Sequence, residues 1–312
     1  MVATIGYGNL GRSMALNLRD SAVDVIVGNR DDDYAARART DGFYALELSE
    51  AASQCDIAYV LLPDEVVPTV FTDLMRALKK GSMVVFPSGY NLAFGLVELR
   101  ADLDACLLAP RMVGEEVREL YERREGFFTY VNVEQDASGV AWERLLGLAF
   151  ACGSLQKGAM QIDARQEAML DLFIEQGVGA YFGSAIQIAF QLGVEAGLPP
   201  EAMVMEMYMS GEMERTIRSF AEQGFYRSVA NHGPTAQFGG FVRSLELDRA
   251  AIEKHMRQTL EKIRDGSFAR EFQAEMDQGY PRLKVVRSVI ESDNPQTAAE
   301  ESLRAAVKRY EA

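Results

Sequence analysis

Cysteines are few in this sequence, and basic residues are fewer than acidic ones. The three cysteines, Cys55, Cys106 and Cys152, are too few for a disulfide framework and too scattered for a C-x-x-C metal site. We therefore expect reduced thiols in a cytoplasmic protein. The chain carries 32 basic and 46 acidic residues, a net charge of −14. Since this charge repels phosphate backbones and anionic lipids, we expect no nucleic acid and no membrane among its partners.

Long apolar runs are absent as well. No stretch reaches the roughly 18 apolar residues that a membrane span needs, and we expect no signal peptide. Hydrophobic residues make up 48% and charged residues 25% of the 312 positions, as in an ordinary globular protein. This length predicts about two domains.

A glycine-rich motif close to the N-terminus carries the strongest functional signal. A β-prone run leads into Gly6, Gly8 and Gly11 in G-x-G-x-x-G register, and a helical pattern and a second apolar run, 23–27, follow. In dinucleotide-binding folds the first glycine permits a tight turn, the second admits the pyrophosphate and the third lets the helix pack on the strand. The alternative is a glycine-rich turn that binds nothing, but the strand and helix context favours dinucleotide binding. The predicted cofactor-binding residues of this turn are Gly6, Tyr7, Gly8, Asn9, Leu10 and Gly11.

Further apolar runs predict that a parallel sheet continues along the chain. The candidate strands are 57–62, 82–86, 105–109 and 127–133, before a closing helix over 138–152. In such sheets ligands bind beyond the carboxyl ends of the strands. The segments that follow those ends are 63–65, 87–91 and 110–114. Leu62, at the end of the first of these strands, and Pro63 and Gly89, in the segments that follow, are further predicted cofactor-binding residues.

Beyond residue 163 the pattern is helical throughout. The predicted helices are 164–196, 200–223, 245–264, 269–277 and 297–310. We therefore expect an α/β protein, with a Rossmann dinucleotide-binding domain over residues 1–160 and an all-helical domain over residues 161–312.

Three carboxylates recur at helical spacing at the start of the second domain. Glu167, Asp171 and Glu175 lie four residues apart, which places them on one face of a helix with apolar neighbours. Like charges at this spacing repel unless a cation neutralises them, and Mg²⁺ commonly takes one or two carboxylates. The pattern leaves two alternatives open, a Mg²⁺ site and a solvated acidic face.

A second acidic helix, 203–217, is rich in methionine and favours core or interface packing. Within it, Glu206 and Glu212 are candidate carboxylates for a second site, and the Ser210-Gly211 pair predicts a bulge or kink. The only two histidines are expected in an ordered turn and on the surface, respectively: His232 and His255.

Nine sequence blocks resemble, in order, those of the short form of ketol-acid reductoisomerase, the acetohydroxy-acid-reducing enzyme of branched-chain amino acid synthesis. The blocks are GYGNLGRSMALNLRDS, VIVGNR, LLPDEV, SGYNLAFG, LAPRMVGEEVRELY, EQDASG, DLFIEQ, VEAGLPPEA and TAQFGG. The resemblance implies a Rossmann domain followed by a knotted helical dimerisation domain, two Mg²⁺ ions, a small anionic carbonyl substrate, and a homodimer whose site is completed across the interface. Asp171 and Glu175 match the carboxylates that hold the metal ions, which favours the metal site.

The second acidic pair of the family is four residues apart on one helix, and its register is open in this sequence. Counted from Pro200 it falls on Glu206 and Ser210, whereas counted back from Glu222 it falls on Tyr208 and Glu212.

Other positions depart from the family pattern where protons are transferred. Ser88 replaces a histidine, Arg111 replaces a lysine and Gly233 replaces a serine. An arginine stays protonated and cannot shuttle a proton, although its fork suits a substrate carboxylate, and a serine does not titrate near neutrality. The predicted catalytic residues are Asp171, Glu175, Arg111, Ser88 and Glu212.

We therefore predict an NAD(P)H-dependent reductase of a small 2-keto acid or a related carbonyl or imine, with the isomerisation lost or changed. Mg²⁺-assisted hydride transfer needs the cofactor, a positioned carbonyl and a Lewis acid, and these parts remain. The first alternative is a ketol-acid reductoisomerase acting on acetolactate, and the second is a non-catalytic dinucleotide-binding protein.

The turn after the second predicted strand, 29–34, is expected to face the adenosine ribose. Arg30 would attract the 2′-phosphate of NADP, whereas the three aspartates that follow, Asp32 among them, would repel it. We predict that NAD(H) is favoured over NADP(H). The alternative is that the aspartates only cap the next helix, in which case Arg30 selects NADP.

Overall fold

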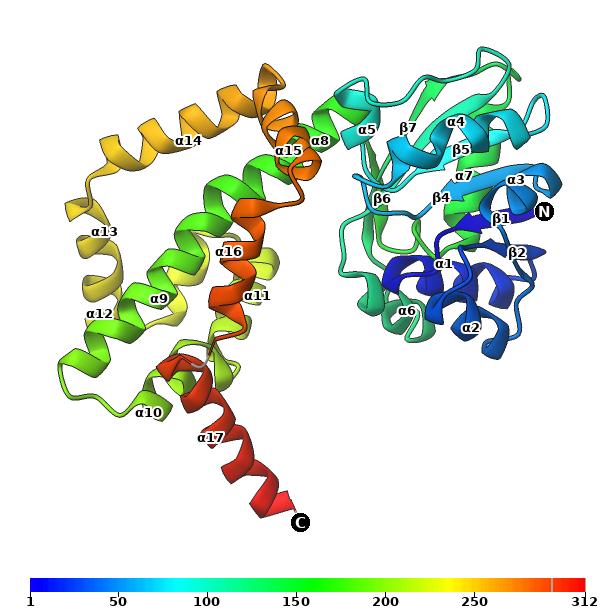
Figure 1. Ribbon diagram of the computed structural model, residues 1–312. Helices are drawn as coiled ribbons and strands as arrows, with labels where there is room; N and C mark the ends of the chain where they lie inside the picture. Colours follow the sequence, from blue (N-terminus) through cyan, green and yellow to red (C-terminus); the bar gives the residue numbers. More distant parts are fainter. Residues whose placement is uncertain (293, 312) are drawn as a thin grey trace. The chain divides into compact units, whose positions relative to one another are not determined.

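The β-branched runs of the first half of the chain pair into one eight-stranded sheet, in the order β3-β2-β1-β4-β5-β6-β7-β8 (Figure 1). The computed structural model describes residues 1–292 and 294–311. Neighbouring strands are parallel except for β6 and β7, which are antiparallel. The strands are β1 (Val2–Ile5), β2 (Val25–Gly28), β3 (Ala45–Leu46), β4 (Ile57–Val60), β5 (Met83–Phe86), β6 (Asp104–Pro110), β7 (Phe128–Gln135) and β8 (Gly158–Gln161).

Amphipathic helices cover both faces of this sheet. The helices before the last strand are α1 (Asn9–Asp20), α2 (Asp33–Thr40), α3 (Leu48–Gln54), α4 (Val67–Ala77), α5 (Tyr90–Ala93), α6 (Gly114–Glu122) and α7 (Ala141–Ala151), and α8 (Ala164–Phe173) follows the last strand. On one face α1 and α7 bury Met14 and Leu145. On the other face α3 and α4 bury Ala51 and Phe71. The central strands are therefore covered on both faces, which is why they appear in the sequence as unbroken apolar runs.

The chain divides into two units, Met1–Asp171 and Leu172–Ala312. The division lies within α8, further along the chain than the predicted boundary after residue 160. The first turns of α8 belong to the sheet-containing unit because they pack on the start of α5. The contact there is close: a Cβ atom on Gly89 would lie 2.0 Å from the backbone oxygen of Ala164.

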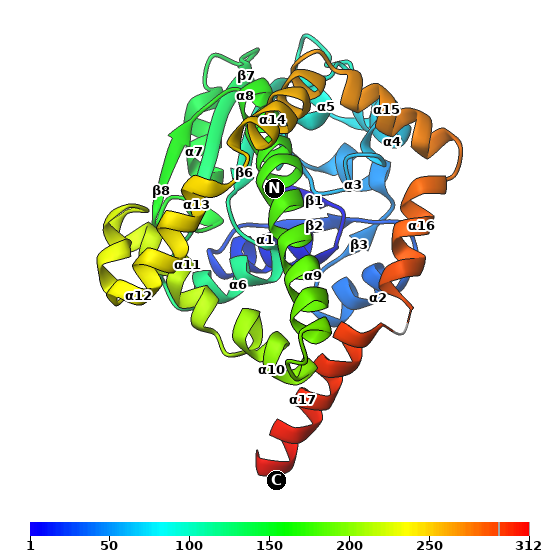
Figure 2. The same ribbon diagram turned by 90° about the vertical axis from the view of Figure 1, so that its left-hand side faces the viewer.

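Within the described residues, the second unit consists of helices alone. Three segments are π-helical and one is 3-10: η1 (Ile174–Gly179), η2 (Met205–Met209), η4 (Phe238–Val242) and η3 (Arg227–Asn231). The α-helices are α9 (Ala180–Glu195), α10 (Pro200–Val204), α11 (Glu212–Gln223), α12 (Pro234–Gln237), α13 (Arg243–Glu246), α14 (Arg249–Arg264), α15 (Ser267–Asp277), α16 (Pro281–Ile290) and α17 (Pro295–Glu311). Near the end of α9, α10 packs beside α17 (Figure 2), and Phe190, Val204 and Ala299 are buried together there. No helix of the described chain is long and apolar enough to cross a membrane.

The predicted fold class, a Rossmann domain followed by a helical domain, is confirmed. The knot and the dimer that the resemblance implies stay predictions. Several elements lie outside the predicted ones, among them β3, β8, α5, α6, α12 and α16. β3 has only two residues and β8 is largely exposed, so neither forms an apolar run.

The predicted helix over 200–223 is broken at the Ser210-Gly211 pair, as the sequence suggested. Gly211 has a φ of +81°, in the left-handed region, and α11 begins directly after it. The predicted helix over 245–264 also starts later, because Asp248 caps α14 by accepting a hydrogen bond from the backbone of Ala251. His255 is exposed on α14, as expected, and its ring meets that of Tyr181 edge-on.

Candidate active site

The glycine-rich turn lies between β1 and α1, and each of its glycines has a different role. Gly6 has a φ of +106°, and a Cβ atom there would lie 2.6 Å from the backbone oxygen of Leu61. A Cβ atom on Gly11 would lie 2.2 Å from the backbone oxygen of Gly6. Around Gly8, by contrast, a Cβ atom would meet nothing within 4 Å. The fold itself therefore requires Gly6 and Gly11, whereas Gly8 leaves open space above the turn.

This open space lies at the N-terminus of α1. No side chain caps the helix, and the first N–H groups of an α-helix, here those of Asn9, Leu10 and Gly11, have no partner inside the helix. Free N–H groups and the helix dipole together favour an anion at this position. The arrangement therefore fits the pyrophosphate of a dinucleotide. Leu62 adjoins the turn, with its Cδ2 atom 3.1 Å from the position of a Cβ on Gly6, and Pro63 follows it at the surface.

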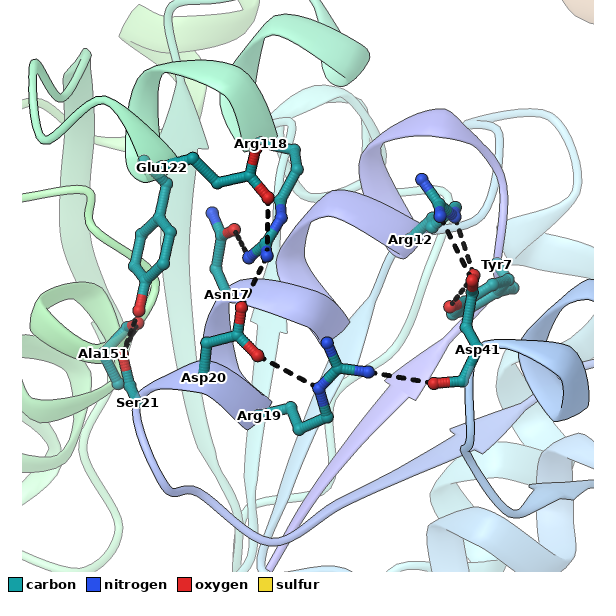
Figure 3. Close-up of polar contacts among 11 residues, drawn as sticks. Tyr7, Arg12, Asn17, Arg19, Asp20, Ser21, Asp41, Arg118, Glu122 and Ala151 are labelled. Atoms are coloured by element: carbon teal, nitrogen blue, oxygen red, sulfur yellow. Dashed lines mark hydrogen bonds and ion pairs between the residues drawn. The ribbon is translucent and has the colours of Figure 1, made fainter.

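Tyr7, predicted to bind the cofactor, has its polar groups engaged within the protein. Its backbone N–H donates to Asn29 Oδ1 at 3.1 Å, and its hydroxyl donates to Asp41 Oδ2 at 2.9 Å (Figure 3). The side chain is 1% exposed. Tyr7 therefore supports the turn through contacts on its buried side.

The turn after β2 has the geometry of a helix cap. Asp32 is the N-cap of α2 and accepts hydrogen bonds from the backbone N–H groups of Tyr34 and Ala35. Its other oxygen, Oδ2, lies 2.7 Å from Arg30 Nε, and this hydrogen bond lowers the pKa of Asp32. Asp32 therefore caps α2, which is the alternative role considered for the aspartates. The same side chain also accepts a hydrogen bond from Arg30.

Two strand ends bring a carboxyl group and a hydroxyl group together. Asp64, which follows β4, accepts a hydrogen bond from Ser88 Oγ at 3.2 Å, beyond the end of β5. Asn91 Nδ2 donates to Asp64 Oδ1, also at 3.2 Å. Burial raises the pKa of Asp64 to about 6, and repulsion from Glu65 and Asp171 acts in the same direction. Asp64 therefore changes its protonation close to neutral pH.

A second carboxyl group with a raised pKa lies at the same edge of the sheet. Glu167 is 1% exposed, and its Oε2 accepts the N–H of Gly89 at 2.6 Å. Arg111 lies between two carboxylates, with Nη2 3.0 Å from Glu167 Oε1 and Nη1 3.0 Å from Asp171 Oδ1. Glu167 Oε1 makes no hydrogen bond of good geometry, so its contact with Arg111 is chiefly electrostatic. Burial raises the pKa of Glu167 to about 7 despite this nearby cation.

Three of the predicted catalytic residues lie at this edge of the first unit: Ser88, Arg111 and Asp171. Glu175 follows Asp171 by four residues, at the start of η1, and is exposed. Glu212 is exposed in the second unit, at the start of α11.

Gly89, a predicted cofactor-binding residue, makes contacts within the protein. Its N–H bonds to Glu167, and its missing side chain admits the start of α8, so a structural contact accounts for this glycine.

Asp171 and Glu175 stay the predicted ligands of a magnesium ion, and each offers carboxylate oxygens. Among the described residues, no three histidine, cysteine, aspartate or glutamate side chains form a metal cluster by themselves. Mg²⁺ usually keeps several waters and takes only one or two carboxylates, so a pair of oxygen ligands is sufficient for it. These two residues would hold the ion.

Sequence reasoning missed the individual roles of Asp64 and Asn91, although both lie in the segments flagged after β4 and β5. The signal for Asp64 was a carboxylate directly following a strand buried on both faces. Burial and hydrogen-bond partners decide its chemistry, and neither is visible in a linear pattern.

A glycine-rich turn that fits a pyrophosphate, after a strand of a largely parallel sheet, is typical of NAD(P)H-dependent oxidoreductases, and the fold is that of this class. Residues 1–158 match the family model described as "Acetohydroxy acid isomeroreductase, NADPH-binding domain", and residues 165–309 match "Ketol-acid reductoisomerase, C-terminal domain". The chain belongs to the ketol-acid reductoisomerase family.

Individual relatives agree with this assignment. The chain is 38% identical to the ketol-acid reductoisomerase (NADP(+)) of Methanopyrus kandleri over 295 residues, which cover 93% of this chain and 89% of the relative. It is 34% identical to that of Leifsonia xyli over 289 residues, 92% of this chain and 84% of the relative. Among solved structures, an NADH-preferring ketol-acid reductoisomerase from an uncultured archean superposes with a TM-score of 0.92 at 29% identity, covering 97% of this chain and 93% of that one. The resemblance found in the sequence is confirmed.

Proposed function

We propose that the protein is a ketol-acid reductoisomerase, which rearranges a 2-acetohydroxy acid such as 2-acetolactate and reduces the product with a nicotinamide cofactor. The observation that carries this proposal is the match of both halves of the chain to the two domains of that family. It favours the first alternative of the sequence analysis over a reductase that has lost the isomerisation.

The proposed reaction moves protons as well as an alkyl group. As the alkyl group migrates from C2 to C3, the C2 hydroxyl loses a proton and the former C3 carbonyl oxygen gains one. Hydride then adds to the new C2 carbonyl and a proton to its oxygen. Asp64 and Glu167 suit these transfers, since their pKa values of about 6 and about 7 let each carboxyl group hold or release a proton near neutrality.

Arg111 contributes a fixed positive charge. It does not release a proton under these conditions, and its position between Glu167 and Asp171 orients both carboxylates. Its planar fork also suits the carboxylate of the substrate. A Mg²⁺ ion held by Asp171 and Glu175 would supply a Lewis acid that polarises the oxygens of the substrate.

A second candidate function is reduction of a small 2-keto acid without rearrangement. Ser88 and Arg111 favour it, because neither side chain transfers a proton near neutral pH as a histidine or a lysine can. Hydride transfer to a carbonyl that is already in place needs fewer proton transfers than the complete reaction.

Two substrates separate these candidates. The protein is incubated with Mg²⁺ and each reduced nicotinamide, once with 2-acetolactate and once with its rearranged product, 3-hydroxy-3-methyl-2-oxobutanoate. A ketol-acid reductoisomerase consumes both at comparable kcat/KM. Turnover of the keto acid alone would support the second candidate, and cofactor binding without turnover of either would indicate a non-catalytic protein.

We also propose that NADH is preferred over NADPH. Three aspartates follow Arg30, and Asp32 engages its guanidinium at 2.7 Å, so the cation that would attract a 2′-phosphate is partly neutralised. Asp31 is held by Arg39 at 3.1 Å and remains exposed. The similar archaeal structure is described as NADH-preferring, which supports the same choice, although the matching family model is described as NADPH-binding. The ratio of kcat/KM for the two cofactors tests the proposal, and a preference for NADPH of more than about tenfold would reject it.

A further inference from the structure

Tyr7 occupies the middle of the glycine-rich turn, between Gly6 and Gly8, but its side chain points into the core. Its ring packs edge-on against Phe43, with 5.9 Å between centroids, in a buried cluster that includes Leu16 of α1. The backbone N–H of the same residue bonds to Asn29, which begins the turn expected to face the ribose. Tyr7 therefore joins the glycine-rich turn to the segment beside it.

Asp41, which follows α2, binds this turn to both ends of α1. Its Oδ2 accepts hydrogen bonds from the Tyr7 hydroxyl at 2.9 Å and from Arg12 Nε at 2.7 Å. Its Oδ1 accepts from Arg12 Nη2 at 3.1 Å, and its backbone oxygen accepts from Arg19 Nη1 at 2.9 Å (Figure 3). Arg12 lies in the first turn of α1 and Arg19 in its last, so a single residue fixes the helix at two points.

These contacts persist over the physiological pH range. The hydrogen bond from Arg12 lowers the pKa of Asp41, while burial and the hydrogen bond to Asp41 raise the pKa of the Tyr7 hydroxyl. Asp41 therefore stays ionised and Tyr7 stays protonated, as the hydrogen bond between them requires.

A glycine-rich turn needs such support because glycine has more conformational freedom than any other residue. The N–H groups at the start of α1 can meet a pyrophosphate only if Gly8 and the first helical turn keep one geometry. Holding a binding loop in its bound conformation strengthens binding, because less conformational entropy is lost on association. We propose that Tyr7 and Asp41 are positioning residues for the dinucleotide, which hold the glycine-rich turn and the start of α1 in the geometry that binds the pyrophosphate.

The test is the dissociation constant of the cofactor in the absence of substrate, measured by calorimetry with NADH and with NADPH. Tyr7→Phe keeps the ring and removes only the hydroxyl. We expect it to weaken binding of both cofactors by the same factor, about tenfold, because the two share the pyrophosphate. A change in their ratio would instead place the effect at the ribose.

Ser21→Ala is the matched control. Ser21 follows the other end of α1, where its hydroxyl donates to the backbone oxygen of Ala151 at 2.7 Å and lies 2.8 Å from the Tyr121 hydroxyl. Loss of this hydroxyl should lower the Tm about as much as Tyr7→Phe does, while the dissociation constants of NADH and NADPH stay unchanged. Equal weakening of binding in both variants would show that general stability, and not positioning, controls affinity.

Asp41→Asn separates positioning from simple electrostatics. Removing a negative charge near an anion site strengthens anion binding if charge alone matters. The proposal predicts weaker binding, because an amide has one acceptor oxygen and an NH2 group that cannot accept, so Arg12 and Tyr7 can no longer keep all their hydrogen bonds to residue 41. Weaker binding of NADH by both Tyr7→Phe and Asp41→Asn supports the proposal. Unchanged or tighter binding in either variant, with the fold retained by circular dichroism, overturns it.

Discussion

Asp171 and Glu175 are the two predicted magnesium ligands. Asp171 Oδ1 also lies 3.0 Å from Arg111 Nη1. Asp171→Asn keeps the size of the side chain and removes the charge that a magnesium ion needs. We expect Mg²⁺-dependent turnover to fall at least a hundredfold, while the dissociation constant of NADH stays within about twofold, because the glycine-rich turn is untouched. Glu175→Gln should behave in the same way.

Asp163→Asn serves as the control for this prediction. Asp163 is an exposed carboxylate that caps the start of the same helix through the N–H of Gln166, so it shares the charge and the helix but not the proposed ligand role. Survival of turnover in Asp171→Asn, or turnover that needs no divalent ion, would make the metal assignment wrong.

The raised pKa values of Asp64 and Glu167 predict how the free energy of unfolding depends on pH. Burial raises their pKa values in the folded protein to about 6 and about 7, above the values of about 4 expected in the unfolded chain. The folded state then holds more protons than the unfolded state between about pH 4 and pH 7. The contribution of these two groups to the free energy of unfolding is fully present below about pH 4, and it is lost as the pH rises through their folded-state pKa values of about 6 and about 7.

The measurement is the Tm of the metal-free, cofactor-free protein between pH 5 and pH 8. We expect a fall of a few degrees over this range, and a smaller fall in Asp64→Asn and in Glu167→Gln, which no longer titrate at those positions. A Tm that rises with pH in the wild type, or the same slope in all three proteins, would contradict the environment assigned to these carboxyl groups.

At the scale of the element, the turn before α1 predicts opposite behaviour for two glycines. A Cβ atom on Gly8 meets nothing within 4 Å, so Gly8→Ala should leave the Tm of the cofactor-free protein unchanged. The new methyl group occupies the space assigned to the pyrophosphate, and we expect NADH to bind at least tenfold more weakly. Gly11→Ala would place its methyl group 2.2 Å from the backbone oxygen of Gly6, and it should lower both the Tm and the affinity.

Calorimetry and thermal melts on the two variants give these numbers directly. If Gly8→Ala bound NADH as the wild type does, the pyrophosphate would have to lie elsewhere.

The second unit shows where prediction from the sequence stops. The helix break at Ser210 and Gly211 lies inside the segment where two ways of counting the second acidic pair disagree by two residues. Tyr208 is turned toward α17, where Gln296 Nε2 donates to its hydroxyl at 2.9 Å, so a contact within the unit accounts for it. A glycine in a helical pattern predicts a break, but only backbone geometry shows where one helical segment ends and the next begins.

The glycine-rich turn and the long buried strands were predictable because each has a local cause, namely residue type at fixed spacing. The network around Asp41 and the pairing of Arg111 with Glu167 were not, because they join residues far apart in the sequence. Contacts of that kind depend on how the sheet is assembled, which no local pattern contains.

At the scale of the whole molecule, the second unit exposes many large apolar side chains. On α9, Ile188 and Leu192 are each 57% exposed, and on α16, Val289 and Ile290 are 62% and 69% exposed. Large apolar side chains exposed in such numbers are typical of interfaces. We expect a homodimer with the active site completed across the interface.

Light scattering at micromolar concentration tests this prediction. Ile188→Glu should shift the mass toward the monomer, whereas the solvent-facing change Glu143→Gln, on α7 of the first unit, should not. A wild-type protein that is monomeric at that concentration would contradict the expectation.

The three buried cysteines can report on the opening of the first unit. All lie in the first unit, at 0% exposure, with Cys55 in the cluster under α3 and α4 and the other two, Cys106 and Cys152, on the opposite face of the sheet. Burial raises the pKa of Cys55 to about 11 and that of Cys106 to about 12, so thiolate is scarce while the unit stays closed. A thiol reagent then labels only molecules whose nucleotide domain has opened. Because ligand binding suppresses opening in proportion to its occupancy, the labelling rate titrated with NADH would yield the cofactor affinity without any substrate or assay of turnover.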